Sequence, residues 1–372
     1  MKIVYIMGAG TSKEAGAPLM DEFFSEAEKI VDSINNSDND FIDELNDKIP
    51  NDDDCDTLRD RFVNVLKFRH DNLPNSNIEE LFSYIETMLS ISKDKNDYFQ
   101  NLKDDMIYLI SKVLDITLAG RDFRIHKSFM ETIGHKAPVT SIISLNYDIL
   151  FDIYYTSYPR LDKMSEGEFL ISGINYGCNY TKFDGEFQNK KEINTGARLS
   201  LLKLHGSLNW LQCKNCNKMF STLDGKILHR LYEEPDYKFK CPTCGDSLLK
   251  PLLIPPSLTK LAIISDSSPM KKIWDSAFRE LVGADKIVII GYSFPEADIH
   301  FKLFLQGALH RNVRERKSPV KIKVITRNKF GEDKVKFEDN YKRVFGGLGE
   351  MLDIEFIYRD FSKYSPYEEE SA

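Results

Sequence analysis

The chain has 372 residues, of which 42% are hydrophobic and 29% charged, and its formal net charge at pH 7 is −8. This composition is ordinary for a globular protein with a sizeable core, and the length allows one large domain with insertions or two domains. Spread-out negative charge argues against general binding to nucleic acids or anionic membranes as the main activity. The one basic cluster, at Arg311, Arg314, Arg316 and Lys317, is predicted to be a solvated helix end.

The N-terminal segment and the cysteines indicate an intracellular location. The apolar run in MKIVYIMGAG is too short for a signal-peptide core, and no segment approaches the ~18 uninterrupted apolar residues of a membrane span. Four of the six cysteines form two C-x-x-C pairs, which in a reducing compartment are metal ligands rather than disulfides. We therefore predict a cytoplasmic protein without a membrane partner.

Several short apolar, β-branched segments each end in a polar or glycine-rich tip. Strands this apolar, separated by long connections, predict a parallel sheet that is covered on both faces. Ligands of such sheets bind beyond the carboxyl ends of the strands, where these tips fall. We therefore predict an α/β fold built on a Rossmann-type parallel sheet. Its strands are expected at Ile3–Met7, Val139–Ser144, Leu201–Leu204, Lys286–Ile290 and Val320–Thr326.

A helical segment separates the first two predicted strands. Apolar residues recur at helical spacing in stripes at 19–30, 78–89 and 102–113, with links rich in Asn, Asp and Lys between them. These stripes predict an inserted helical subdomain at 21–135. The Rossmann-type core would then comprise residues 1–20, 136–209 and 251–360, and a small zinc-binding module residues 210–250.

A glycine-rich turn, Gly8-Ala9-Gly10-Thr11-Ser12, directly follows the first strand. Glycines in this position allow a pyrophosphate to approach the backbone, and the following amides can donate to it. The third glycine of G-x-G-x-x-G is missing, because Lys13 occupies its place and Gly16 comes later. The pattern therefore predicts a phosphate-binding turn, with an ordinary tight turn as the alternative.

The four paired cysteines predict a metal site. Cys213-x-x-Cys216 and Cys241-x-x-Cys244 are separated by 24 residues, and each pair can offer two thiolates to one tetrahedral Zn²⁺. Gly245 after the second pair suits a tight turn. Four cysteines leave no coordination position open, so the zinc is expected to be structural; four unligated thiols are the alternative.

Three polar residues stand at the tips of predicted strands. His205 lies between an apolar strand and Gly206-Ser207, while Asn146 and Asp148 follow the second strand in SLNYD. A lone histidine is often a packing residue, and Asn or Asp at a strand end often caps a turn. Their shared place at the carboxyl edge nevertheless favours a role in ligand binding or catalysis.

These motifs together resemble the sirtuin family. The order GAGTSKEAGAP, SLNYD, HGS, two cysteine knuckles, GYS and a strand ending in RN matches it over about residues 1–20 and 136–330. The resemblance implies that NAD⁺ binds, that Asn146 places a water or nucleophile, that Asp148 meets the carboxamide, and that His205 is a general base. The implied cofactor-binding residues are Gly8, Ala9, Gly10, Thr11, Ser12, Gly16, Gly291, Ser293 and Asn328, of which the last three would hold the adenosine end.

Three departures separate the chain from sirtuin deacylases. Leu19-Met20-Asp21 stands where deacylases carry a phenylalanine-arginine pair, and the helical insertion is larger than theirs. The segment 250–257 replaces an FGE-type segment that pairs with the acyl-peptide, and its prolines make it a poor template for strand addition. These departures resemble the bacterial antiviral-defence sirtuin-like NADases. They imply an NAD⁺ glycohydrolase, with a protein deacylase or ADP-ribosyltransferase, or a non-catalytic NAD⁺ or ADP-ribose sensor, as alternatives.

An NAD⁺ hydrolase inside a cell must be controlled, because it would otherwise drain its own host. Residues 330–372 are predicted to be a short charged tail, too small for a sensor domain. Control would then fall to the helical insertion, whose apolar residues exceed what a lone bundle face requires and would mark an interface. We therefore expect a homo-oligomer or a partner such as a ring-forming ATPase. The surplus apolar residues are Phe62, Val65, Leu66, Phe82 and Met88.

Overall fold

The structure is a computed structural model that describes most of the chain. The described residues are 1–36, 55–92, 96–118, 121, 123–134, 140–153, 174–183, 190–193, 199–222, 240–245, 248–257, 264–295, 298–316, 319–327 and 331–366.

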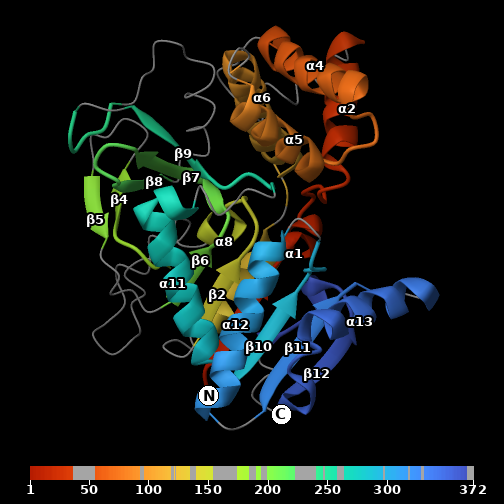
Figure 1. The fold of residues 1–372 in the computed structure, drawn as a ribbon, viewed down its shortest axis with the longest axis vertical. Coiled ribbons are helices and arrows are strands. Elements are labelled where there is room, and N and C mark those ends of the chain that lie inside the picture. Colours follow the sequence, from red (N-terminus) through yellow and green to blue (C-terminus); the bar gives the residue numbers. More distant parts are fainter. Residues whose placement is uncertain are drawn as a thin grey trace.

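A seven-stranded sheet forms the centre of the molecule, in the order β12-β11-β10-β1-β2-β6-β3 (Figure 1). All six neighbouring pairs are parallel, so the carboxyl ends of the strands meet at one edge. The predicted fold class is thereby confirmed. The strands are β1 (Ile3–Met7), β2 (Thr140–Ser144), β3 (Ile174–Asn175), β6 (Leu199–Lys203), β10 (Lys286–Ile290), β11 (Val320–Thr326) and β12 (Leu352–Tyr358).

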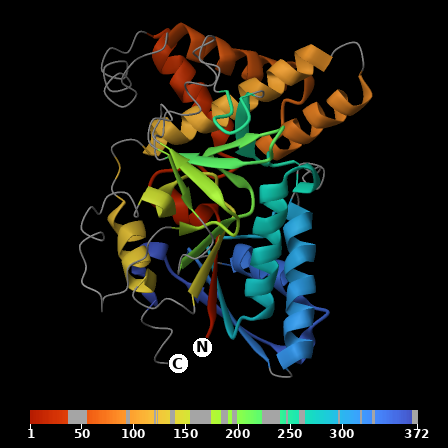
Figure 2. The ribbon, with the colours of Figure 1, turned by 90° about the vertical axis from the view of Figure 1, so that its left-hand side faces the viewer.

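The apolar sequences of the central strands reflect burial on both faces. Every residue of β1, β2 and β10 is buried, as continuous hydrophobic runs in parallel strands require. Helices α11 and α12 lie on one face and α7 on the other (Figure 2). The ring of Phe129 on α7 meets that of Tyr5 edge-on at 5.2 Å. The layers of this core include α7 (Arg124–Gly134), α8 (Leu150–Ile153), α11 (Ser268–Val282) and α12 (Ile299–Arg316).

The C-terminal segment is part of the sheet domain, so its prediction as a charged tail is wrong. It forms α13 (Gly331–Phe345), two short 3-10 turns at Gly349–Met351 and Phe361–Lys363, and the edge strand β12. The ring of Tyr341 packs edge-on against Phe356 at 5.6 Å and is fully buried. The strand was missed because its apolar and charged residues alternate, and only a parallel neighbour on one side fixes it there.

A second, five-stranded sheet has the order β5-β4-β8-β7-β9 and lies above the carboxyl edge of the first (Figure 1). Its pairs are antiparallel except for β4 with β8. It connects the cysteine pairs to the central domain, since Cys213 is the last residue of β7. The strands are β4 (Tyr180–Phe183), β5 (Lys190–Ile193), β7 (Gly206–Cys213), β8 (Met219–Thr222) and β9 (Leu249–Leu253).

Four helices form a bundle over the second sheet: α2 (Phe23–Asn35), α4 (Cys55–Asn72), α5 (Ile78–Ile91) and α6 (Asn96–Leu118). Three of their stripes were predicted, and α4 was not. The bundle shares one hydrophobic cluster with Leu211, Phe220 and Leu249 of the second sheet. A capping box between Asn77 and Glu80 fixes the start of α5, which points toward the central sheet.

The apolar residues that suggested an interface are used inside this bundle. Phe62, Val65 and Phe82 have no exposed surface, and Leu66 and Met88 pack partly buried against the same cluster. The argument that they form an exposed surplus is therefore wrong. Among the helices that the structure describes, none has the length and apolarity that crossing a membrane requires.

Candidate functional site

A cavity of about 450 Å³ lies at the carboxyl edge of the central sheet. Its walls come from the glycine-rich turn after β1, from the segments after β2, β6, β10 and β11, and from the start of α5. With Arg359 and Phe361 after β12, six of the strands thus contribute to it, directly or through the segments that follow them. This is the place at which open parallel sheets bind their ligands.

The glycine-rich turn packs directly against the turn after β10. The amide of Gly8 donates to Ile290 O at 2.9 Å, and that of Gly10 donates to Gly291 O at 2.8 Å. A Cβ on Gly10 would lie 2.7 Å from the Gly291 Cα, and Gly291 itself has a φ of +64°. The close contact between the two turns therefore requires these glycines, whether or not a ligand also requires them. The short helix α1 (Ala9–Lys13) starts from this contact.

Asn146 joins the segment after β2 to the glycine-rich turn. Its Nδ2 donates to Gly8 O at 3.0 Å and lies 3.2 Å from Thr11 Oγ1 and 2.9 Å from Ser12 Oγ. Because a carbonyl oxygen only accepts, the amide nitrogen must face Gly8. The Oδ1 atom is then on the other side of the amide, and Asn146 lines the cavity.

Asp148 lies behind the cavity wall. Its Oδ2 accepts from Ser12 Oγ at 2.6 Å, and its Oδ1 accepts from the amide of Leu150, where α8 begins. Its backbone oxygen accepts from Lys203 Nζ at 2.5 Å, and Lys203 also pairs with the buried Asp152 at 3.1 Å. Asp148 therefore holds the turn and helix α8 in place from beneath.

His205 is buried in the turn between β6 and β7, with about 5% of its surface exposed. Its Nδ1 lies 3.0 Å from Leu145 O, and its Nε2 lies 3.4 Å from Asp298 Oδ1. The second oxygen of Asp298 accepts from Tyr292 Oη at 2.9 Å. Asp298 is a candidate site residue that the motif comparison did not single out, although it is the final residue of GYSFPEAD.

Two tyrosines border the His205 pair as neutral hydrogen-bond donors. Burial raises the pKa of both Tyr147 and Tyr292 well above the usual range, and the negative charges of Asp298 and Glu79 raise it further. Tyr147 donates to Ile254 O at 2.8 Å, and its ring lies 6.1 Å from the His205 ring. Both phenols therefore stay protonated through the physiological pH range.

The remaining predicted cofactor residues fall into three groups. Ala9, Gly10, Gly291 and Ser293 line the cavity together with His205 and Asn146, whereas Gly8, Thr11 and Ser12 lie beneath it. Gly16 lies beside Thr117 on the outer side of the turn, with a φ of +106°. Asn328 lies outside the described residues.

Other cavity residues are not among the predicted site residues. Asn77 and Glu79 reach the cavity from the start of α5, Arg327 follows β11, and Arg359 follows the edge strand β12. The capping pattern before α5 is visible in the sequence, but its place beside the sheet edge depends on how the bundle docks. The insertion therefore contributes directly to the cavity wall.

The four cysteines of the two C-x-x-C pairs lie together on turns beside β7 and β9. Their Sγ atoms all lie within 4.8 Å of one another, with 3.6 Å between Cys213 and Cys244 and between Cys216 and Cys241. Sulfurs at about 2.3 Å from one tetrahedral Zn²⁺ would be about 3.8 Å apart, so the arrangement fits this metal. Gly245 has a φ of +72°, as the tight turn requires.

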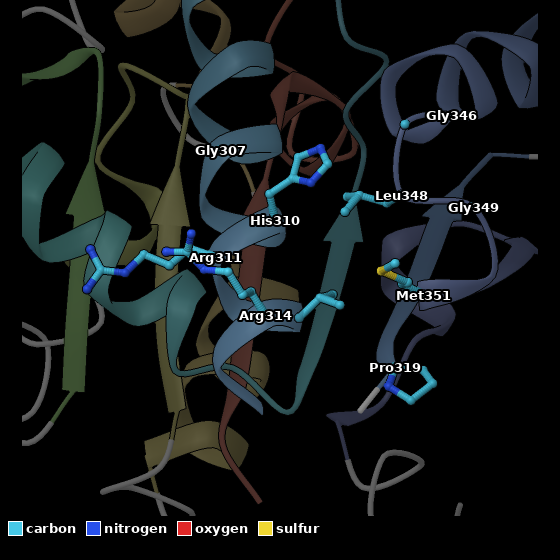
Figure 3. A pocket seen from close by; sticks show the side chains of 11 residues that line it. Gly307, His310, Arg311, Arg314, Pro319, Gly346, Leu348, Gly349 and Met351 are labelled. Carbon is cyan, nitrogen blue, oxygen red and sulfur yellow. The ribbon is translucent and has the colours of Figure 1, made fainter. Parts of the chain in front are cut away.

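A wider hollow of about 1130 Å³ lies elsewhere, between α12 and the turn at 346–351 (Figure 3). His310 faces that turn, while the chains of Arg311 and Arg314 extend along the other side of the helix. Both arginines are exposed, as predicted for a solvated helix end. Arg316 instead pairs with Asp285 and donates to Gly283 O at 3.1 Å. The hollow includes none of the predicted site residues, and its size alone does not make it a functional site.

No family model and no curated protein matches the chain. Among solved structures, the chain is similar to Sir2Tm bound to a propionylated peptide, with 11% identity, 100% of this chain and 92% of that chain covered, and a TM-score of 0.40. It is also similar to Sir2 in complex with the inhibitor EX-527, 2'-O-acetyl-ADP-ribose and deacetylated p53 peptide, with 12% identity, coverage of 100% and 93%, and a TM-score of 0.37. Similarity at this level says nothing about activity.

Proposed function

We propose that this chain binds NAD⁺ in the cavity at the sheet edge and hydrolyses its nicotinamide–ribose bond, releasing nicotinamide and ADP-ribose. The observation that carries this proposal is that the glycine-rich turn, Asn146 and His205 border one cavity at the carboxyl edge of a parallel sheet. Its volume is within the range of about 300–1,000 Å³ that ligand pockets have. The ordered sirtuin-like motifs suggest NAD⁺ as the ligand.

The charges around the cavity suit a dinucleotide. Three cationic residues line it: Lys13 from α1, Arg327 after β11 and Arg359 after β12. Their positive charge would offset the negative charge of a diphosphate. Asp298 lines the cavity 3.4 Å from His205, and Glu79 lines it from the start of α5. The diphosphate would lie against the turn at 8–12, the adenosine end toward Gly291 and Ser293, and the positively charged nicotinamide near the carboxylates.

The chemistry requires a positioned water and a proton acceptor. Departure of nicotinamide leaves positive charge on the ribose, as in glycoside cleavage, and the buried carboxylates would stabilise that charge. Asn146 Oδ1 would accept a hydrogen bond from the attacking water, because its Nδ2 is held by Gly8. His205 and Asp298, whose Oδ1 lies 3.4 Å from the His205 Nε2, would together receive the proton of the water. Asp148 would contribute indirectly, by holding the glycine-rich turn through Ser12 and by holding the start of α8.

A feature of the segment after β9 favours hydrolysis over deacylation. Ile254 donates its amide to His205 O at 2.9 Å, and its carbonyl accepts from Tyr147 Oη. The next two residues are prolines, which carry no amide hydrogen. An acyl-peptide that adds as a strand needs free backbone groups, and this segment offers few of them.

The test is to incubate the purified chain with NAD⁺ and to separate the products by chromatography. Hydrolysis predicts equal amounts of nicotinamide and ADP-ribose without any peptide, and no acetyl-ADP-ribose when an acetyl-lysine peptide is added. Nicotinamide release only with the peptide, together with an acetylated product, would indicate a deacylase. Transfer of ADP-ribose to protein would indicate a transferase, and binding without turnover would indicate a sensor.

We include in this proposal how the hydrolase is controlled and where in the cell it acts. An NAD⁺ hydrolase acting in the cytoplasm, for instance in antiviral defence, requires a trigger such as assembly into a homo-oligomer or binding of an ATPase. The buried state of Phe62 and Phe82 removes them as a basis for that assembly. The start of α5 is now the better candidate for coupling, because Glu79 borders the cavity. Zn²⁺ on the four cysteines would be structural.

A further inference from the structure

Both ring nitrogens of His205 face oxygen acceptors. Leu145 O, 3.0 Å from Nδ1, is a carbonyl and cannot donate, so Nδ1 must carry a hydrogen. Asp298 Oδ1 lies 3.4 Å from Nε2, and both side chains are about 94% buried. An Nε2 lone pair pointing at a buried carboxylate would be repelled by it. The separation is longer than that of an ordinary N–H···O hydrogen bond, so the contact is a buried ion pair, which a proton on Nε2 favours.

We propose that Asp298 and Tyr292 hold His205 as an imidazolium in the resting protein, so that a histidine–aspartate pair, and not a lone neutral imidazole, is the proton acceptor of the site. Asp298 is then the carboxylate of the proton-accepting pair, and Tyr292 positions it. The proton lies on His205 because imidazole is a stronger base than a carboxylate. Tyr292 occupies the other carboxylate oxygen with its hydroxyl hydrogen, which favours the ionised form of Asp298.

The surroundings of the ring are consistent with a positive charge. The neutral phenol of Tyr147 borders it from the segment after β2, with the two rings at 6.1 Å. The carboxylate of Glu79 approaches from α5 closely enough to act on both Tyr147 and Tyr292. Lys203, two residues before His205, has its charge offset by Asp152 at 3.1 Å. The cations Lys13, Arg327 and Arg359 line the same cavity from α1, β11 and β12.

For the reaction, which rests on the proposed function, the pair accepts one proton per turnover. The water oxygen bonds to the anomeric carbon of the ribose while the carbon–nitrogen bond breaks and its electrons leave with neutral nicotinamide. The proton of the water passes to the carboxylate of the pair and then to solvent. Since the carboxylate is the group that must be free, activity should persist below pH ~6.5, where a lone imidazole would already be protonated.

Histidine-selective ¹⁵N NMR of the full chain tests the resting state without NAD⁺. The chain has seven histidines, and the signal of His205 is assigned as the one that is absent from the spectrum of His205→Gln. In the wild-type protein at pH 7.5, both nitrogens of His205 should carry hydrogen. In Asp298→Asn the Nε2 signal should move to the position of an unprotonated nitrogen, while signals of the exposed His310 should not change. A wild-type Nε2 without hydrogen, or one unaffected by Asp298→Asn, would overturn the proposal.

The pH profile of turnover provides the second test. Asp298→Asn should lower the rate by about tenfold or more at pH 7.5 and move the acid limb up to about pH 6.5, the value for a lone imidazole. Tyr292→Phe should move it in the same direction by less. An unchanged acid limb in Asp298→Asn would contradict the proposal. Absence of NAD⁺ turnover with a protonated Nε2 in the spectra would remove the proposed hydrolysis but support the His205–Asp298 pair.

Discussion

The cavity at the sheet edge and the four-cysteine cluster both gather reactive side chains, but over different distances along the chain. Each half of the cluster lies within a turn of four residues, and two turns complete it. The cavity instead brings Gly10, Asn146, His205 and Asp298 together from the ends of four strands. The cluster therefore depends on local turns and a metal, whereas the cavity depends on the register of the whole sheet.

This difference predicts that the two regions respond differently to substitution. A lost thiolate should affect folding more than chemistry, because zinc binding contributes free energy of folding directly. A lost polar group in the cavity should affect chemistry more than folding, because the strands beneath are held by apolar burial. Variants in each region therefore test whether the contribution of the cysteine cluster to folding is separable from the contribution of the cavity to catalysis.

The largest effect is expected for the cysteine cluster. One Zn²⁺ per chain should be found by elemental analysis, and Cys241→Ser should release it and lower the melting temperature strongly, since structural zinc contributes on the order of 10 kcal/mol. Cys55→Ser is the matched control, because Cys55 lies on α4 outside the cluster. It should keep the zinc. Freshly purified protein without zinc would contradict the assignment.

The next effect concerns the cavity. His205→Ala should lower NAD⁺ turnover by about 10²–10⁴-fold through loss of proton transfer, and it should also cost about 1–3 kcal/mol of folding free energy, because its buried contacts with Leu145 O and Asp298 are lost. His310→Ala, on the exposed side of α12, is the control. Asn146→Ala should also abolish turnover, but it should cost about 0.5–1.5 kcal/mol of folding free energy as well, because the buried hydrogen bonds of its Nδ2 to Gly8 O and Ser12 Oγ are lost. Wild-type turnover in both variants would exclude the mechanism.

A smaller effect is expected in the helical bundle, which both regions contact. Phe62 is fully buried and packs edge-on against Tyr108 at 6.3 Å. Phe62→Ala should reduce the free energy of unfolding by about 3–5 kcal/mol. The neighbouring Val63, 39% exposed, provides the control substitution to alanine. Equal midpoints of denaturation for the two variants would show that the bundle core does not lie where the structure has it.

The smallest effect concerns alkaline pH. Burial raises the pKa of Tyr341 well above its usual range, so the folded state keeps the proton after the unfolded chain has lost it. The unfolded state then binds fewer protons, and stability should fall as pH rises above about 10. Tyr341→Phe should reduce that slope in a series of urea titrations, whereas Tyr98→Phe, at a half-exposed position, should not. An identical slope in both would contradict this linkage.

The sequence alone determined the features that depend on nearby residues. The five apolar strands, the three helical stripes and the paired cysteines follow from periodicity and spacing. The strands and cysteine pairs were found close to their predicted positions, whereas the first stripe starts at Leu19, before α2, and α6 extends beyond 102–113 on both sides. β2 and β6 differ from the prediction by one or two residues at their ends. A strand buried on both faces must be apolar throughout, and a knuckle needs its cysteines at a fixed separation, so both leave a local pattern.

The tertiary structure decided what depends on contacts between distant segments. Phe62 and Phe82 looked like surplus apolar surface until their partners in α6 and the second sheet were placed. β12 alternates apolar and charged residues, and only pairing with β11 makes it part of the sheet. Asp298 is one acid among many in the sequence; it becomes a partner of His205 because β10 and β6 end at the same edge, on either side of β1 and β2. Contacts of this kind arise from sheet order, which leaves no mark in the spacing of residues along the chain.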